Sequence, residues 1–287
     1  MPTIGEAVHA AAQRLREAAE EDARLEAEVL LAHATGVDRT HVLARLHDQL
    51  AVEDTRAFDT LIARRAAREP LAYIVGRREF YGIDIICAPG ALIPRPETEM
   101  LVDLALEEIE RRGRDVRIVD VGTGSGAIAV AIAANAPDMR IVASDASDAA
   151  LAIARRNVEA HGLAARVTLR RASLLEDAGM CDVIVANLPY VSEREWAELQ
   201  PEIREHEPRE SLVGGETGAE VIEQLIAQAP AHVAASGVLA AEIGETQSER
   251  LLSCARRFFP DADAYVMKDF AGRDRVLVVR REEAGRE

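Results

Sequence analysis

The chain has 287 residues, 48% of them hydrophobic, enough for one large and one small domain with real cores. Its formal net charge of −16 argues against a non-specific nucleic-acid binder, which needs a basic surface. Three widely spaced cysteines form no C-x-x-C pair, so we expect neither a disulfide framework nor a zinc site. No basic segment precedes an apolar run at the start and no apolar run is long enough to cross a bilayer, so neither a signal peptide nor a membrane span is expected.

The first 70 residues predict helices only. Thr3 and Glu6 form a candidate capping box, Gly36 is a candidate helix stop and Asp38 a candidate N-cap. We expect the core of a small bundle from the apolar positions Val8, Ala11, Ala12, Leu15, Leu25, Val29, Leu43, Leu46, Leu50, Phe58, Leu61 and Ile62. The region has 9 Arg against 13 acidic residues, so we expect it to hold a protein or brace the next domain rather than bind RNA.

The periodicity changes between Tyr73 and Ile93. The run Y-I-V-G-R-R-E-F-Y-G-I-D-I-I-C-A-P-G predicts a β-hairpin linker, with Gly82 as one turn residue. A helix is then expected to open at 94–98, with Pro96 in its first turn, and to run to about residue 112. The predicted domains are therefore 1–70 (helical), 71–93 (hairpin linker) and 94–287 (the large domain).

Strands and helices alternate through the large domain. Strands are expected at 117–121, 140–145, 167–171, 182–186, 238–242, 264–268 and 275–280, with helices between most of them, including 127–135 and 149–161. Short apolar strands separated by helices predict a mostly parallel sheet covered on both faces. The last two strands are too close for a helical crossover, so the final strand is expected to be antiparallel.

A glycine-rich loop follows the first of these strands, in D-V-G-T-G-S-G-A from Asp120 to Ala127. Its glycines allow a tight turn and a close approach to a ligand beyond the carboxyl ends of the strands. Asp145 ends the second strand, where a carboxylate can accept from two ribose hydroxyls. The loop indicates an adenosine-containing cofactor, and by itself leaves NAD and S-adenosylmethionine both open.

The stretch V-I-V-A-N-L-P-Y, which ends at Tyr190, favours S-adenosylmethionine. Pro189 holds Leu188 extended, so the Asn187 side-chain oxygen and the Leu188 carbonyl can both face the pocket. Two acceptors at a fixed spacing suit a planar NH2 group, and Tyr190 offers an aromatic face for packing. Such a pair can aim a weakly nucleophilic amide or aryl amine at an activated methyl group.

At this point the sequence resembles the HemK/PrmC protein-(glutamine-N5) methyltransferases, which modify the Gln of the GGQ motif in peptide chain release factors. The resemblance runs from about residue 5 to 280. It rests on Y-I-V-G-R-R-E-F-Y-G, L-I-P-R-P-E-T-E, D-V-G-T-G-S-G-A-I-A, N-L-P-Y-V, E-P-R-E-S-L-V-G-G-E-T-G and A-G-R-D-R-V. The first two and last two motifs are not generic to methyltransferases, which makes the match specific.

The resemblance implies a class I S-adenosylmethionine-dependent methyltransferase fold: a Rossmann-like, seven-stranded, mostly parallel sheet preceded by a helical substrate-recognition domain and a hairpin. It implies cofactor contacts at Gly122, Thr123, Gly124, Ser125, Gly126, Asp145, Leu174 and Asn187. It also implies a catalytic tetrapeptide of Asn187, Leu188, Pro189 and Tyr190. The implied product is S-adenosylhomocysteine, the partners are release factors, and the location is the cytoplasm. No metal, membrane or direct nucleic-acid contact is expected.

Two positions depart from the family pattern. Leu188 stands where the family usually has Pro, and Ser173 stands where it often has an acid, so adenine-side contacts at Ser173 and Leu174 stay open. The rRNA adenine dimethyltransferases also carry N-L-P-Y, which keeps an N6-adenine enzyme as the alternative. A non-enzymatic binding protein and an NAD dehydrogenase are weaker readings. The charged segment 192–208 reads equally as a lid and as a surface helix.

Overall fold

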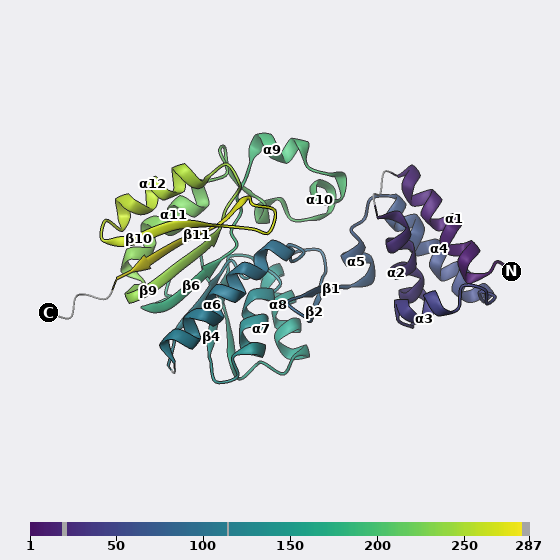
Figure 1. Ribbon diagram of the computed structural model, residues 1–287, viewed down its shortest axis with the longest axis horizontal. Helices are drawn as coiled ribbons and strands as arrows, with labels where there is room; N and C mark the ends of the chain where they lie inside the picture. The colour runs from purple at the N-terminus through teal and green to yellow at the C-terminus, as the bar shows by residue number, and fades with distance from the viewer. Residues whose placement is uncertain (19–21, 114, 283–287) are drawn as a thin grey trace. The chain divides into compact units, whose positions relative to one another are not determined.

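The computed structural model describes residues 1–18, 22–113 and 115–282. The chain divides into two compact units. One is formed by Met1–Arg77 together with Gln200–His206, and the other by Arg78–Leu199 together with Glu207–Glu287. Figure 1 labels helices and strands in each of them.

The first unit is helical, as expected. It contains α1 (Ile4–Glu17), α2 (Ala23–Thr35), α3 (Arg39–Ala44), α4 (Val52–Ala66), α5 (Leu71–Val75) and α10 (Pro201–His206). The predicted capping box is confirmed, because the backbone N–H groups of Thr3 and Glu6 each donate to the other residue's side chain. Gly36 ends α2 in the left-handed conformation, and Asp38 caps α3 by accepting from the His41 backbone N–H.

The predicted core of this unit is right for α1, α4 and Leu50, wrong at Leu25 and Leu43, and reaches only half-buried positions outside the core cluster at Val29 and Leu46. Leu25 is 42% exposed and Leu43 is 38% exposed. Helix α2 instead buries a face that contains Ala27, Leu30 and Leu31, which follow one another at helical spacing. Leu25 lies two residues before Ala27, and this spacing points its side chain away from the buried face. Its apolar character alone therefore did not show which way the side chain points.

The first unit also takes in a segment from much later in the chain. Helix α10 follows the tetrapeptide region in sequence, yet its Glu202 pairs with two arginines of the first unit. Arg68 Nε donates to Glu202 Oε2 at 3.0 Å, and Arg65 Nη2 lies 3.7 Å from Glu202 Oε1. Ion pairing thus joins α10 to the end of α4.

The hairpin is shorter than the sequence predicts. Residues from Tyr73 belong to α5, which ends at a left-handed Gly76, so the expectation of a hairpin from Tyr73 is wrong for its first residues. Strands β1 (Arg77–Phe80) and β2 (Ile83–Ile86) pair around Tyr81 and Gly82. Both turn residues have positive φ, as in the tight turns that connect hairpin strands.

The large unit is built on a seven-stranded sheet in the order β10-β11-β9-β6-β3-β4-β5. The strands are β3 (Ile118–Val121), β4 (Ile141–Asp145), β5 (Val167–Arg171), β6 (Cys181–Ala186), β9 (Val233–Glu242), β10 (Ala262–Lys268) and β11 (Asp274–Arg281). Strands β3, β4, β5, β6 and β9 pair in parallel, whereas β11 is antiparallel to both β9 and β10. The predicted mostly parallel sheet with an antiparallel final strand is confirmed.

Helices cover both faces of this sheet (Figure 1). Helices α6 (Glu99–Arg112), α7 (Ala127–Asn135) and α8 (Asp148–Ala160) pack with one set of strand residues, including Ile118 and Val183. Helices α11 (Glu220–Gln228) and α12 (Ser248–Phe258) pack with the alternate set, including Val119 and Ile184. Successive strand side chains point to opposite faces, so each short apolar strand serves two cores.

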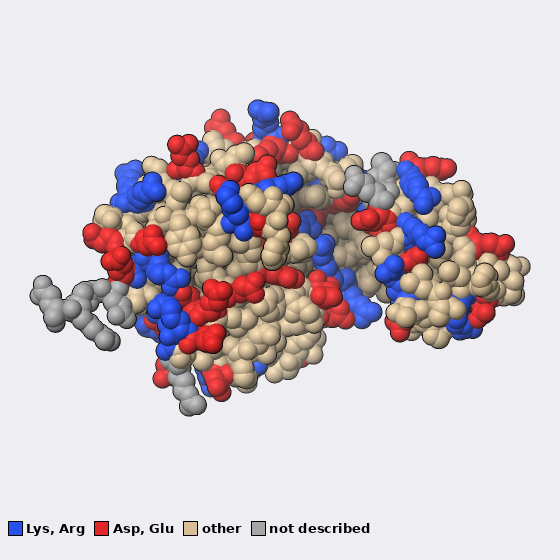
Figure 2. Space-filling model, in the orientation of Figure 1, with Lys and Arg blue, Asp and Glu red and all other residues tan. Residues whose placement is uncertain are grey.

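Short elements complete the unit. They are the 3-10 turns η1 (Pro96–Thr98), η2 (Arg209–Ser211) and η3 (Ala229–Ala231), helix α9 (Glu193–Glu198), and a small parallel pair of β7 (Val191–Ser192) and β8 (Val213–Gly215). On the face drawn in Figure 2, acidic and basic side chains are interleaved, and the described residues there gather into no continuous basic patch.

Candidate active site

The glycine loop lies between β3 and α7 and has an unusual backbone. Gly122, Gly124 and Gly126 all have positive φ, at 71°, 57° and 81°. The N–H groups of Gly122 and Thr123 both donate to the Ser144 carbonyl of the neighbouring strand β4, each at 2.9 Å. L-residues with a side chain rarely adopt these angles, which explains the alternating glycines and fixes the loop at the carboxyl edge of the sheet.

Asp120, near the end of β3, supports this loop through its side chain. Its side chain is fully buried, and its Oδ2 accepts from the Thr123 hydroxyl at 2.5 Å. Burial raises the pKa of the Asp120 carboxyl to about 7, an effect that the Thr123 hydrogen bond only partly offsets. Asp120 does not line the cavity described below, so its contribution is to hold Thr123 and the loop in place.

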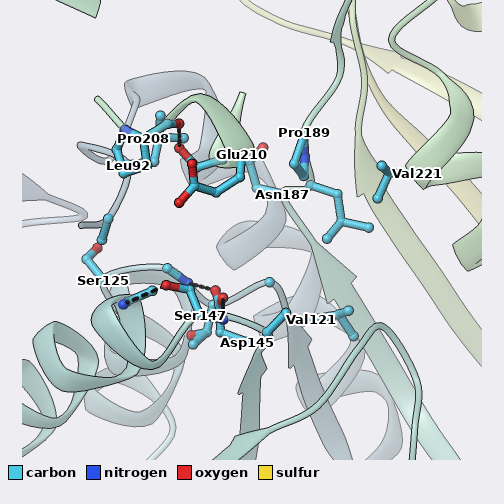
Figure 3. Close-up of a pocket in the computed structure, with 18 of the residues that line it drawn as sticks. Leu92, Val121, Ser125, Asp145, Ser147, Asn187, Pro189, Pro208, Glu210 and Val221 are labelled. Atoms are coloured by element: carbon cyan, nitrogen blue, oxygen red, sulfur yellow. Dashed lines mark hydrogen bonds between the residues drawn. The ribbon is translucent and has the colours of Figure 1, made fainter. Parts of the chain in front are cut away.

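Asp145 ends β4 beside the loop, as predicted. Its Oδ2 accepts from the Gly124 N–H at 2.9 Å, and its Oδ1 accepts from the Ser147 N–H at 2.8 Å. Burial raises the pKa of the Asp145 carboxyl, whereas the backbone donors lower it. Figure 3 shows Asp145 and Ser147 together on one side of the cavity. Each carboxylate oxygen retains acceptor capacity toward a ligand hydroxyl.

A cavity of about 380 Å³ opens over these strand ends. Its walls bring together most of the residues singled out in the sequence: Gly122, Thr123, Gly124, Ser125, Asp145, Ser173, Leu174, Asn187, Leu188 and Pro189. Gly126 is not part of the wall, because it lies behind the loop, where a Cβ would sit 3.2 Å from Ala154 Cβ. The volume falls within the range of about 300–1,000 Å³ that small-molecule sites occupy.

Asn187 follows β6 and lies across the cavity from Asp145 (Figure 3). Its side-chain nitrogen donates to Thr98 Oγ1 at 2.9 Å, while no hydrogen bond within the described chain occupies its Oδ1. The next side chain, Leu188, is 6% exposed and packs over Gly122. The glycine loop and the tetrapeptide are thus neighbours because β3 and β6 pair in parallel and end together.

Tyr190 occupies a different place from its three predecessors. It is absent from the cavity wall, its ring packs with the core on the α11 and α12 face, and its hydroxyl donates to Glu242 Oε1 at 3.0 Å. Burial and the adjacent Glu242 charge raise the pKa of the Tyr190 hydroxyl, so it remains a donor. In this structure Tyr190 braces the tetrapeptide.

Two contacts that sequence reasoning missed hold the rim of the cavity. Glu207, 5% exposed, accepts from the Ile93 N–H at 3.0 Å and from Arg95 Nη2 at 2.5 Å. It therefore fixes the loop that precedes η1. Glu207 opens the motif E-P-R-E-S-L-V-G-G-E-T-G, which was the available signal, although neither composition nor spacing names its partner.

Close backbone approach explains the glycines of the same motif. A Cβ on Gly214 would lie 2.3 Å from the carbonyl oxygens of both Pro189 and Gly218. A Cβ on Gly218 would lie 2.2 Å from the Tyr190 carbonyl oxygen. The glycines let this segment pack directly on the back of the tetrapeptide, so they shape the site without entering it.

Asn157 ties the hairpin to the glycine loop, and nothing in the sequence reasoning identified it. Its fully buried side chain donates to the carbonyls of Ser125 and Ile86, at 2.8 and 3.1 Å, and accepts from the Ile86 N–H at 2.7 Å. A polar residue on an otherwise apolar helix face was the only signal.

The charged segment after the tetrapeptide forms two short helices, α9 and α10, neither of which has a buried residue. Ser192 and Glu195 form a capping box at the start of α9. Past α10, Pro208 and Glu210 lie on the cavity wall, as Figure 3 shows. A role as a lid for the segment 192–208 stays a prediction.

Comparison with known proteins gives a family to both parts of the chain. Residues 6–76 match the family model described as the PrmC N-terminal domain, and residues 98–204 match the methyltransferase small domain. A release factor glutamine methyltransferase from Geobacter sulfurreducens is 41% identical over 92% of this chain and 91% of its own length. One from Nitratidesulfovibrio vulgaris is 42% identical over 94% and 92%.

The chain belongs to the release factor glutamine methyltransferase family. The expected class I methyltransferase fold is confirmed with it. Among solved structures, the N-terminal domain of human METTL16 in complex with SAH has a TM-score of 0.51 at 18% identity, covering 75% of this methyltransferase and 81% of that chain. At that identity the likeness concerns the fold alone. Within the described residues, no helix of this methyltransferase combines the length and apolar composition needed to span a bilayer.

Proposed function

We propose that this methyltransferase transfers a methyl group from S-adenosylmethionine to the side-chain amide nitrogen, N5, of the Gln in the GGQ motif of peptide chain release factors. The products are the N5-methylated Gln and S-adenosylhomocysteine. The amide nitrogen gains the methyl group and loses one proton, so no oxidant, reductant or metal enters the balance.

The cofactor side of the cavity fits S-adenosylmethionine. The loop from Gly122 to Ser125 is free of side chains at alternate positions, which allows a ligand to approach its backbone. The Asp145 carboxylate can accept hydrogen bonds from two ribose hydroxyls, and Ser173 and Leu174 line the region expected for the adenine. When bound there, the cofactor supplies a methyl group on a positively charged sulfur.

The acceptor pair after β6 is the observation that carries the proposal. Asn187 and Leu188 lie on the cavity wall across from Asp145, and the Asn187 nitrogen is occupied by Thr98. Its oxygen, together with the Leu188 carbonyl, can then accept both N–H bonds of a planar amide. Two fixed acceptors hold the amide nitrogen in one orientation, which lowers the entropic part of the barrier.

The same acceptors assist the loss of the proton. The lone pair of an amide nitrogen is delocalised, and hydrogen bonds from both N–H groups to fixed oxygens favour a pyramidal, more nucleophilic nitrogen. As the nitrogen gains the methyl group it becomes strongly acidic, so a pre-positioned base is not required. The hydrophobic wall formed by Leu188 and Val221 helps exclude water from this step.

A protein substrate agrees with the charge of the chain better than RNA does. The net charge is −16, and the face in Figure 2 has acidic and basic groups interleaved. Binding to an RNA backbone relies on a basic surface that releases counterions. The relatives are release factor glutamine methyltransferases, and we propose that the helical unit of this chain helps to recognise release factors in the cytoplasm.

The decisive experiment is an assay with purified release factor and S-adenosylmethionine labelled on its methyl group. The expected result is label on the GGQ Gln only, located by mass spectrometry of the digested release factor. The matched control is a release factor with that Gln changed to Ala, which should take up no label. Label on rRNA in a parallel reaction, with none on the release factor, would establish the N6-adenine alternative.

A further inference from the structure

Three residues that are far apart in sequence form one hydrogen-bonded chain behind the tetrapeptide. Asn187 Nδ2 donates to Thr98 Oγ1 at 2.9 Å, and Thr98 Oγ1 donates to Glu242 Oε2 at 2.6 Å. Asn187 follows β6, Thr98 ends η1 and Glu242 ends β9. Thr98 is 4% exposed and Glu242 is 1% exposed, so water does not compete freely for these bonds.

The hydroxyl of Thr98 determines the direction of the whole chain. A hydroxyl has a single hydrogen to donate, and here the buried carboxylate of Glu242 takes it. Thr98 can then only accept from Asn187, and only the NH2 end of the Asn187 side chain can donate. The oxygen end of that side chain must therefore face the other way.

Glu242 is held as an acceptor from its second oxygen as well. Tyr190 donates its hydroxyl to Glu242 Oε1 at 3.0 Å. Burial raises the pKa of the Glu242 carboxyl, an effect that the hydrogen bonds from Thr98 and Tyr190 and the positive charge of Arg275 oppose. In its ionised form Glu242 has no proton to donate, so it accepts from both hydroxyls and leaves Thr98 no hydrogen to donate to Asn187.

We propose that Thr98 and Glu242 are positioning residues that fix the orientation of the Asn187 side-chain amide, so that it presents an oxygen and not an NH2 group to the substrate. The inference rests on the proposed function and adds a specificity device to it. A reversed Asn187 would set its own N–H bonds against those of the substrate amide. The correct orientation selects a substrate with N–H donors and rejects a carboxylate, such as Glu in place of the substrate Gln.

The kinetic test compares Thr98→Val with Thr98→Ser. Valine keeps the shape of threonine and removes the hydroxyl, which frees Asn187 to reverse. We expect kcat to fall by a factor of about 10 to 100, the cost of one lost orienting hydrogen bond, with the Kd for S-adenosylmethionine and the KM for release factor nearly unchanged. Thr98→Ser restores the hydroxyl and should recover most of kcat.

A structural test is independent of turnover. A neutron crystal structure of the wild-type enzyme locates deuterium atoms directly. The expected result is one deuterium between Thr98 Oγ1 and Glu242 Oε2, and an Asn187 ND2 group facing Thr98. A Thr98 deuterium directed at Asn187 would overturn the inference.

The outcomes separate this inference from the function on which it rests. If the wild-type enzyme leaves the GGQ Gln unlabelled, the proposed function is wrong. The neutron structure still decides whether Thr98 and Glu242 orient Asn187. If the wild-type enzyme is active and Thr98→Val retains its kcat, only the positioning role of Thr98 and Glu242 is overturned. A collapse of cofactor affinity in Thr98→Val also overturns it, since Thr98 would then act as a wall of the cofactor site.

Discussion

The side chain of Leu188 fills the space over Gly122, so that a Cβ on Gly122 would lie 2.7 Å from Leu188 Cδ2. This contact joins the loop after β3 to the tetrapeptide after β6, two strands that pair in parallel. It also shows what Leu does where the family usually has Pro. The larger side chain packs on the glycine loop, so this loop and the Asn-Leu-Pro-Tyr tetrapeptide support each other directly.

Gly122→Ala is therefore expected to damage the site in two ways. The positive φ of 71° costs an L-residue about 1–2 kcal/mol, and the clash with Leu188 adds about 1–3 kcal/mol of overpacking. Gly162→Ala is the matched control, because Gly162 has a φ of 68° with nothing within 4 Å of its Cβ position. Denaturant unfolding should show the stability cost of the positive φ in both variants. Calorimetry should show weaker cofactor binding in Gly122→Ala only.

A double mutant separates the clash from the backbone strain. In Gly122→Ala/Leu188→Ala the new methyl group meets no Leu188 side chain, so the two effects on stability should be less than additive. Strict additivity of the unfolding free energies would mean that the contact between these two residues contributes nothing.

Asn187→Ala is expected to separate binding from turnover. Removing one polar group aimed at the reacting atoms lowers kcat by about two to three orders of magnitude in well-studied enzymes. The Kd for S-adenosylmethionine should change by less than about threefold, under 1 kcal/mol, because Asp145 and the glycine loop are untouched. Single-turnover kinetics and calorimetry measure the two quantities. A lost cofactor affinity with normal turnover at saturation would reverse the roles assigned here.

Asp120 predicts a pH-dependent term in stability. Its folded-state pKa is about 7, against a usual value of 3.8. Between these values the folded state retains a proton that the unfolded state releases, so the Asp120 contribution to the free energy of unfolding falls as pH rises, by at most about 1.4 kcal/mol per pH unit. The contribution should level off above pH 7, where both states are ionised.

The comparison of wild type with Asp120→Asn isolates this term from other ionisable groups. Asn can still accept from the Thr123 hydroxyl and does not titrate. From pH 4 to 7 the free energy of unfolding of the wild type should fall relative to that of Asp120→Asn. Above pH 7 the difference between the two should be constant. A difference that is constant from pH 4 would mean that Asp120 is ionised in the folded state throughout.

The three cysteines are predicted to differ in reactivity. Burial raises the pKa of the Cys87 and Cys181 thiols to about 11, and their residues are 5% and 1% exposed. Cys254 is only half-buried. Because the thiolate is the reactive form, iodoacetamide at pH 8 should modify Cys254 first, and the other two only after unfolding in guanidinium. Rapid native-state labelling of Cys87 would contradict its packing here.

Local features of this chain were readable from the sequence. The capping box at Thr3 and Glu6, the left-handed stop at Gly36 and the strand from Val167 to Arg171 all depend on neighbouring residues, and each lies where the pattern predicted. The loop ending at Gly126 and the acid at the end of β4 follow from the same local rules. Periodicity identified helices reliably, but it placed Leu25 and Leu43 on the wrong face, because an apolar residue does not state its partner.

The sequence by itself determined the order of strands and helices, the glycine loop and the polar tetrapeptide, since these arise from backbone preferences and short-range spacing. Only the tertiary structure decided which way Asn187 faces. The orientation of Asn187 depends on Thr98, which lies 89 positions earlier in the chain. It depends through Thr98 on Glu242, which lies 144 positions after Thr98. Parallel pairing of β6 and β9 brings Asn187 and Glu242 to one edge of the sheet, and the buried hydroxyl of Thr98 then fixes the orientation of one relative to the other.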